Sequence, residues 1–156
     1  MKSQNNKITI KVFEAFAGYG GGSFGLKRLK ENMPNIEYEV IGYSEFDKYA
    51  AALFDANHKD KNGQPLTNWG DISKINPIDL PDFDMFMGFP CQPFSSAGMQ
   101  LGTDDPYGRG TMLGHIIRIC SIKRPKYIFL ENVKGFTHGK FTKIHDQLIK
   151  DLTNLG

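Results

Sequence analysis

The chain has 156 residues and a formal net charge of +2 at pH 7, a mild basicity that permits a nucleic-acid partner without identifying one. Its length suits one domain with its own core, which we place at residues 8–156 behind a polar tail at residues 1–7. No apolar run approaches the ~18 residues of a membrane span and no signal peptide is evident, so we expect a cytoplasmic setting in which Cys91 and Cys120 stay reduced.

The first half of the chain alternates between strand and helix patterns. Polar and apolar residues alternate over residues 8–16, which predicts a strand that breaks into glycines. Leucines then recur at helical spacing until Pro34 ends the helix. Residues 37–43 favour a second strand and residues 46–54 a second amphipathic helix, followed by a polar loop at residues 57–68.

The second half continues the alternation. We expect a short third strand near Trp69, a fourth strand at residues 84–89 and a helix at residues 112–122. Residues 127–130 are almost continuously apolar, as is typical of a parallel strand that is covered on both faces. Apolar residues at helical spacing over residues 144–152 close the chain with a helix.

This order of elements predicts a doubly wound α/β fold with a mostly parallel sheet. In such a sheet, ligands bind outside the carboxyl ends of the strands. A glycine-rich or chemically useful segment follows each predicted strand, namely residues 16–22, Glu45, Asp71, Cys91 and Glu131. Their convergence on one sheet edge predicts a cofactor site beside a reactive centre.

The glycine turn at residues 16–22 has the composition of a ligand-binding loop, because glycine lets the backbone turn sharply and approach a ligand closely. Residues 20–25 fit the Gly-x-Gly-x-x-Gly pattern of dinucleotide sites, and Glu45 follows at a suitable distance for a ribose contact. That pattern is common in glycine-rich sequence, and an acid such as Glu45 also suits a helix N-terminus. The residues alone therefore leave the cofactor open.

Cys91 lies between two prolines, Pro90 and Pro93, directly after an apolar run. Proline holds φ at about −65° and disfavours the α region in the preceding residue, so we expect an extended segment that presents the thiol on a stiff loop. A free cysteine is more often a small buried hydrophobe. A glycine turn and two strand-end carboxylates elsewhere in the sequence favour Cys91 as a nucleophile instead.

In this order, the motifs of the chain resemble those of the cytosine-C5 DNA methyltransferases from about residue 12 to residue 155. The matching segments are Phe16-Ala17-Gly18-Tyr19-Gly20-Gly21, Tyr43-Ser44-Glu45-Phe46-Asp47-Lys48-Tyr49-Ala50, Gly70-Asp71-Ile72, Gly88-Phe89-Pro90-Cys91-Gln92, Arg109-Gly110-Thr111 and Glu131-Asn132-Val133-Lys134. The resemblance implies the sheet of S-adenosylmethionine-dependent methyltransferases, cut short after the fifth strand and its helix.

The resemblance also implies S-adenosylmethionine as the cofactor, with Glu45 on the ribose hydroxyls and Asp71 and Ile72 at the adenine edge. The implied cofactor-binding residues are Phe16, Gly18, Tyr19, Gly20, Gly21, Glu45, Phe46, Asp71, Ile72, Pro90 and Met112. The implied nucleotide-contacting residues are Gln92, Ser95, Arg109 and Asn132. We expect no metal, because the histidines lack cysteine partners and metal-ligand spacing.

The implied reaction is methyl transfer to C5 of cytosine, with Cys91 and Glu131 as the catalytic residues. C5 is a poor nucleophile, so the Cys91 thiolate would first add to C6. Glu131 would bind N3 and the exocyclic amine and offer a proton at N3, which desolvation of its carboxyl promotes. Because C6 is inaccessible in a stacked duplex, the base must be flipped out, and residues 95–102 have the composition of a closing loop.

The family's Gln-x-Arg-x-Arg motif, target recognition domain and closing helix have no counterpart in the sequence. The resemblance implies double-stranded DNA as the substrate, in a bacterial or viral restriction-modification setting. Because these motifs are missing, we expect a second polypeptide that supplies the remaining half. The isolated chain is expected to be inactive, with its strand at residues 127–130 at an open sheet edge. Two alternatives stay open: a tRNA substrate, and a cofactor-binding fragment or subunit without activity.

Overall fold

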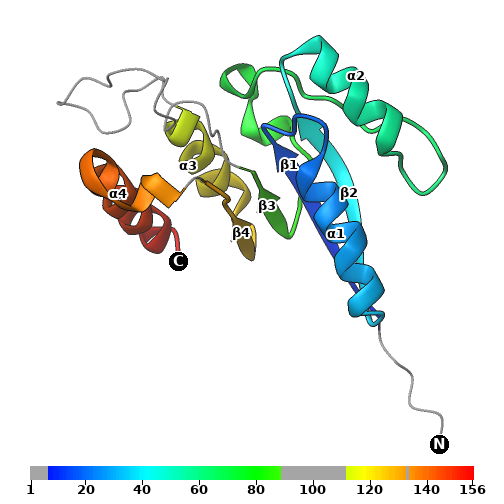
Figure 1. The fold of residues 1–156 in the computed structure, drawn as a ribbon, viewed down its shortest axis with the longest axis horizontal. Helices are drawn as coiled ribbons and strands as arrows, with labels where there is room; N and C mark the ends of the chain where they lie inside the picture. Colours follow the sequence, from blue (N-terminus) through cyan, green and yellow to red (C-terminus); the bar gives the residue numbers. More distant parts are fainter. Residues whose placement is uncertain (1–6, 89–111, 133) are drawn as a thin grey trace, which may run out of the picture.

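The computed structural model describes residues 7–88, 112–132 and 134–156 and centres on a parallel sheet with the strand order β2-β1-β3-β4 (Figure 1). The strands are β1 (Ile8–Ala15), β2 (Ile36–Ser44), β3 (Met85–Met87) and β4 (Tyr127–Phe129). β1 pairs with β2 along its whole length but with β3 only around Phe13, which pairs with Phe86. The strand order reverses at β1, so the switch point of the sheet lies between β1 and β3.

Within the described residues, four α-helices connect and follow the strands. They are α1 (Gly21–Asn32), α2 (Lys48–Asn57), α3 (Met112–Lys123) and α4 (Thr142–Asn154), with short 3-10 turns at η1 (Ile72–Lys74), η2 (Pro77–Asp79), η4 (Lys134–Thr137) and η5 (Gly139–Phe141). Asp47 begins α2, because its side chain accepts hydrogen bonds from the N–H groups of Tyr49 and Ala50. No helix within the described ranges is long and apolar enough to cross a bilayer.

The two faces of the sheet carry separate apolar clusters. On one face, Leu26 of α1 belongs to the same buried cluster as Val12 of β1. On the other face, Ile116 of α3 and Leu148 of α4 share a larger cluster with Phe13. Alternate residues of β1 thus point to helices on opposite sides, and the predicted doubly wound α/β fold is confirmed.

The prediction of a third strand near Trp69 is wrong. This segment touches β2 through a single parallel bridge between Tyr43 and Asn68. The N–H of Trp69 donates to the Tyr43 carbonyl (2.8 Å). At Glu45, however, the partner is the Asn68 side chain, which accepts the N–H of Glu45 (3.1 Å) and donates to its carbonyl (3.0 Å). An asparagine side chain therefore replaces a further rung of the ladder, and no strand forms.

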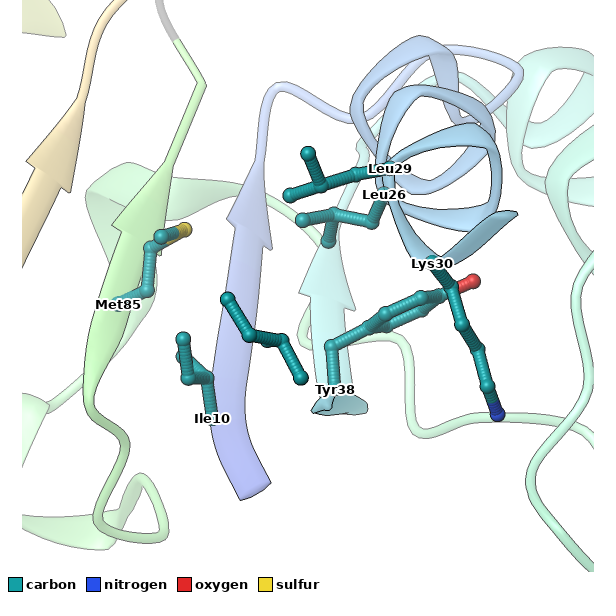
Figure 2. A pocket seen from close by; sticks show the side chains of 7 residues that line it. Ile10, Leu26, Leu29, Lys30, Tyr38 and Met85 are labelled. Atoms are coloured by element: carbon teal, nitrogen blue, oxygen red, sulfur yellow. The ribbon is translucent and has the colours of Figure 1, made fainter. Parts of the chain in front are cut away.

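The α1 face of the sheet is only partly covered. β4 lies at the edge of the described sheet, as predicted, and its Tyr127 and Phe129 side chains are 54% and 56% exposed. They share a face with Met85 and Met87, their partners on β3. A small apolar groove of about 50 Å³ lies next to this face. Figure 2 shows how Leu26 and Leu29 of α1 reach over β1 towards β3 in this groove. The groove is lined by Ile10, Leu26, Leu29, Lys30, Ile36, Tyr38 and Met85.

Candidate cofactor and catalytic site

The turn between β1 and α1 uses backbone conformations that most residues avoid. Phe16, Gly18 and Gly20 have φ values of 52°, 54° and 89°. A residue with a side chain in the left-handed region costs roughly 1–2 kcal/mol, so surrounding contacts must hold Phe16 in place. One of them comes from the next residue, because the N–H of Ala17 donates to the Ser44 carbonyl (3.1 Å) and ties the turn to the end of β2.

Glu14 supports the same turn from inside the sheet. It is 3% exposed, and its carboxylate accepts hydrogen bonds from the N–H groups of Gly22 (3.0 Å) and Ser23 (3.1 Å) and from the Ser23 hydroxyl. Burial raises the pKa of the Glu14 carboxyl, whereas these hydrogen bonds act in the opposite direction. Sequence reasoning missed Glu14, although an acid at an inward-facing strand position just before a glycine turn is a usable signal.

Glu45 anchors the outer side of the turn. Its Oε2 accepts the N–H of Gly18 (2.9 Å) and its Oε1 accepts the N–H of Asp47 (2.8 Å). The structure therefore brings together the two segments, after β1 and β2, that the sequence pattern predicted to meet. A carboxylate oxygen has two lone pairs, so each oxygen can accept a second hydrogen bond from a ligand.

Asp71 lies beside this pair because Ser44 donates its hydroxyl to the carbonyl of Gly70 (2.7 Å). Its Oδ1 accepts the hydroxyl (2.8 Å) and the N–H (2.9 Å) of Ser73, and in this way Asp71 caps η1. These hydrogen bonds lower the pKa of the Asp71 carboxyl, so it is ionised at neutral pH and acts as an acceptor.

Exposed aromatic residues adjoin Glu45 and Gly18 in the sequence. Phe46 follows Glu45 directly and is 81% exposed, and Tyr19 in the glycine turn is also exposed. An exposed ring next to anchored carboxylates offers a stacking surface beside hydrogen-bond acceptors. These rings and carboxylate acceptors fit a ligand with a purine base and a ribose, because the base can stack on a ring and the ribose hydroxyls can donate to a carboxylate.

The Ile72 side chain is 4% exposed and packs in the larger core. A contact of Ile72 with the adenine edge therefore stays a prediction, and it would have to use the main chain. Its carbonyl accepts a hydrogen bond from Arg118 of α3 (2.9 Å), and the same guanidinium donates to the carbonyl of Ile75 (2.5 Å). Arg118 thus ties the segment after Asp71 to the helix that begins at Met112.

Comparison with known proteins identifies the family of this chain. The family model described as C-5 cytosine-specific DNA methylase matches residues 10–156. The chain belongs to this methylase family. It is 42% identical over 140 residues to the type II methyltransferase M1.ScrFI of Lactococcus lactis subsp. cremoris, and 38% identical over 147 residues to the type II methyltransferase M.NgoBI of Neisseria gonorrhoeae.

These alignments cover most of the methylase chain but less than half of each relative. They include 88% and 94% of the chain, but 32% of M1.ScrFI and 42% of M.NgoBI. The fold also resembles a putative DNA modification methyltransferase encoded within an E. coli prophage, with a TM-score of 0.66, 23% identity, and coverage of 93% of this chain and 38% of that one. The Dnmt2 methyltransferase of S. pombe gives a TM-score of 0.61 at 21% identity, with coverage of 92% and 40%.

The residues predicted to act on the substrate are only partly described in this methylase chain. The N–H of Gly88 donates to the carbonyl of Phe129 (3.0 Å), so β3 and β4 end at the same edge. Glu131 and Asn132 follow there, Glu131 exposed and Asn132 half-buried. Because solvent reaches Glu131, the desolvation expected of it would have to accompany substrate binding. The predicted residues that lie outside the described ranges are Pro90, Cys91, Gln92, Ser95 and Arg109.

Proposed function

We propose that this chain is the cofactor-binding and catalytic part of an enzyme that transfers a methyl group from S-adenosylmethionine to C5 of cytosine in double-stranded DNA. The observation that carries the proposal is the anchored carboxylate of Glu45, held by the N–H of Gly18 beside the exposed ring of Phe46. This set of groups suits an adenosine ligand at the switch point of the sheet. Membership of the methylase family supports the cytosine substrate.

The chain's own residues would hold the cofactor in three ways. Glu45 would accept hydrogen bonds from the ribose hydroxyls, using the lone pairs that its main-chain contacts leave. Phe46 would stack its exposed ring on adenine, and the ionised Asp71 would accept from the exocyclic amine. Bound in this way, S-adenosylmethionine supplies an electrophilic methyl group. The positively charged sulfonium also suits an edge that is rich in carboxylates.

The catalytic residues would act on a base that has been flipped out of the duplex. The Cys91 thiolate forms a bond to C6, while Glu131 gives a proton to N3 and thereby neutralises the charge that develops on the ring. C5 becomes nucleophilic and takes up the methyl group, and the sulfur of the broken bond leaves as S-adenosylhomocysteine. Loss of the C5 proton to solvent then restores the double bond as the Cys91 thiolate leaves. N3 returns its proton to Glu131, so the enzyme returns to its starting state.

Further protein, on the same chain or on a second polypeptide, would complete the enzyme. The chain corresponds to 32% and 42% of two methyltransferase relatives, and it exposes apolar strand residues at the edge of the described sheet. Tyr127 and Phe129 of β4 lie on the same face as the groove beside α1. An exposed apolar sheet edge favours pairing with another chain. This arrangement supports a partner that adds strands and the DNA recognition region.

Cofactor binding is tested first, on the chain alone. S-adenosylhomocysteine should raise the melting temperature of the purified chain, because a ligand that binds only the folded state stabilises it. NAD serves as the control, since the glycine pattern also suits a dinucleotide. A larger shift with NAD than with S-adenosylhomocysteine would overturn the cofactor assignment.

The reaction is tested by transfer of a tritiated methyl group to duplex DNA. The chain alone should be inactive, and activity should appear when the remaining part of a relative is added as a second polypeptide. Cys91→Ser should abolish transfer without changing cofactor affinity, because a hydroxyl stays protonated where a thiol ionises. Transfer to tRNA in place of DNA would reject the proposed substrate, and a monomer that methylates DNA unaided would reject the need for a partner.

A further inference from the structure

His58 occupies the space directly beneath the glycine turn, although no sequence motif pointed to it. It follows α2, where its N–H donates to the Phe54 carbonyl (2.9 Å) and ends the helix. The chain is extended at His58, with φ −127° and ψ 127°, so the imidazole leaves the α2 axis and contacts the residues that begin α1. Two segments that lie far apart in the sequence thus meet at this ring.

The His58 side chain makes one directional contact and two ring contacts. Its Nε2 lies 3.1 Å from the carbonyl oxygen of Tyr19, at the tip of the turn. A carbonyl only accepts, so Nε2 carries the proton and donates it. The ring packs edge-on against Phe24 of α1, with centroids 4.5 Å apart, and in a tilted arrangement against Phe54 of α2, with centroids 4.7 Å apart. Both rings fix the direction of the Nε2–H group.

The turn is shaped to receive this ring. A Cβ atom on Gly20 would lie 2.2 Å from Nε2 and 2.4 Å from Cδ2 of His58, and the φ of Gly20 is 89°. Two independent constraints therefore require glycine at position 20: its positive φ, and the imidazole that fills the space where a side chain would lie. The N–H of Gly20 also donates to the Ala17 carbonyl (2.7 Å), which closes the turn.

The surroundings of His58 favour its neutral form. Burial lowers the pKa of the imidazole and Lys27 of α1 acts in the same direction, whereas the hydrogen bond to Tyr19 acts against them. A neutral imidazole whose Nε2 proton is already donated to a main-chain carbonyl is poorly placed for proton transfer. Its contacts are those of a structural donor.

We infer that His58 is a positioning residue for the cofactor: its Nε2–H donates to the Tyr19 carbonyl and holds the glycine turn in the conformation that binds S-adenosylmethionine. This inference rests on the proposed function. Without the donor, the turn must be ordered when the cofactor binds, and the ordering reduces affinity. Glu45 and Glu14 hold the N–H groups of Gly18 and Gly22, so His58 completes the support at the tip.

Two substitutions separate the donor from the ring. His58→Phe keeps an aromatic ring between Phe24 and Phe54 but removes the donor, so it should weaken binding of S-adenosylhomocysteine about three- to tenfold in isothermal titration, with a melting temperature close to that of the unaltered chain. His58→Gln keeps an N–H donor near the position of Nε2 but removes the ring. It should lower the melting temperature and bind within about twofold of the unaltered chain.

Ile116→Val provides the stability control, because Ile116 is fully buried in the larger cluster, on the face of the sheet that α3 covers, and makes none of the contacts of His58 described above. It should lower the melting temperature without changing cofactor affinity. If His58 only stabilised the fold, the variants with the lowest melting temperatures would also bind S-adenosylhomocysteine most weakly. Such a correlation across all three variants would overturn the inference.

Hydrogen exchange of the Gly20 amide gives a readout that needs no cofactor. The amide should exchange faster in His58→Phe than in His58→Gln, since only the former lacks the donor to the turn. Equal exchange rates in the two variants would reject the positioning role. If the unaltered chain does not bind S-adenosylhomocysteine, the proposed function fails, and the exchange rates still decide whether His58 holds the turn.

Discussion

Gly88→Ala should destabilise the protein severely, because Gly88 is the point at which β3 leaves the sheet past the end of β1. A Cβ atom there would lie 1.9 Å from the carbonyl oxygen of Ala15 and 2.9 Å from its carbonyl carbon. Both are backbone atoms of a paired strand and cannot move aside as a side chain does. The φ of Gly88 is 122°, a conformation that residues with a Cβ rarely adopt.

The two effects add to a large loss. A backbone held in a sparsely populated region costs roughly 1–3 kcal/mol, and forcing an atom into a packed site costs roughly 1–3 kcal/mol more. The total of about 2–6 kcal/mol is a large part of the ~5–15 kcal/mol by which domains are usually stable. At about 2–4 °C per kcal/mol for a chain of this size, the melting temperature should fall by about 5–20 °C.

Two other glycines separate the contributions in thermal and urea unfolding followed by circular dichroism. Gly63 has a φ of 77° and Gly25 lies in α1 with an ordinary φ, and a Cβ atom added to either would face open space, with no packed neighbour within 4 Å. Gly63→Ala should therefore lose only the backbone part, and Gly25→Ala should gain roughly 0.5–1 kcal/mol. The reasoning is refuted if Gly88→Ala costs no more than Gly63→Ala.

Three further outcomes follow from the site and the core. Glu45→Ala should weaken S-adenosylhomocysteine binding in isothermal titration by roughly 1.5–3 kcal/mol, the range for a hydrogen bond to a charged group, and an unchanged affinity would remove Glu45 from the ribose site. Burial lowers the pKa of the His58 and His115 imidazoles below 6.5, so these histidines are protonated in the unfolded chain before they are protonated in the folded chain as the pH falls. The free energy of unfolding in urea should therefore be full above about pH 6.5 and should decrease below it. A flat profile from pH 7.5 to 5.5 contradicts this. Burial also raises the pKa of the Cys120 thiol to about 12. In the folded protein, iodoacetamide at pH 8 should therefore alkylate Cys91 and spare Cys120, as measured by peptide mass spectrometry. Alkylation of Cys120 first would contradict its burial.

The sequence pattern predicted the order of elements well because strand and helix periodicities are local. The first strand was expected at residues 8–16 and β1 is Ile8–Ala15, and the helix expected at residues 112–122 is α3, Met112–Lys123. The segment near Trp69 failed because its outcome depends on a contact between distant residues. The Asn68 side chain takes the place that a strand backbone would fill, and periodicity carries no information about that.

The sequence predicted which segments form the candidate site but not the residues that hold the glycine turn in place. Motifs after β1 and β2 placed Glu45 beside the glycine turn, and its bond to Gly18 agrees. Glu14 and His58 were missed. A histidine at a helix end looks like an ordinary surface residue, whereas the position of Glu14 just before the glycine turn was a signal that went unused. Their importance comes from burial and from the carbonyl and amide groups that face them, which only the folded chain brings together.

The short pairing of β3 with β1 has a consequence for how the protein folds. β1, α1 and β2 are consecutive in the chain, and β1 and β2 pair along the whole of β1, so this unit can form early from nearby residues. β3 contributes three residues and must find Val12 from Met85, across a long loop whose closure costs entropy. The edge where the chemistry is proposed therefore contains parts that we expect to form at different times. The glycine turn should form with the early unit, whereas β3, which leads to Cys91, should dock later and detach first. The glycine turn and its contact with Glu45 can then persist after β3 has detached.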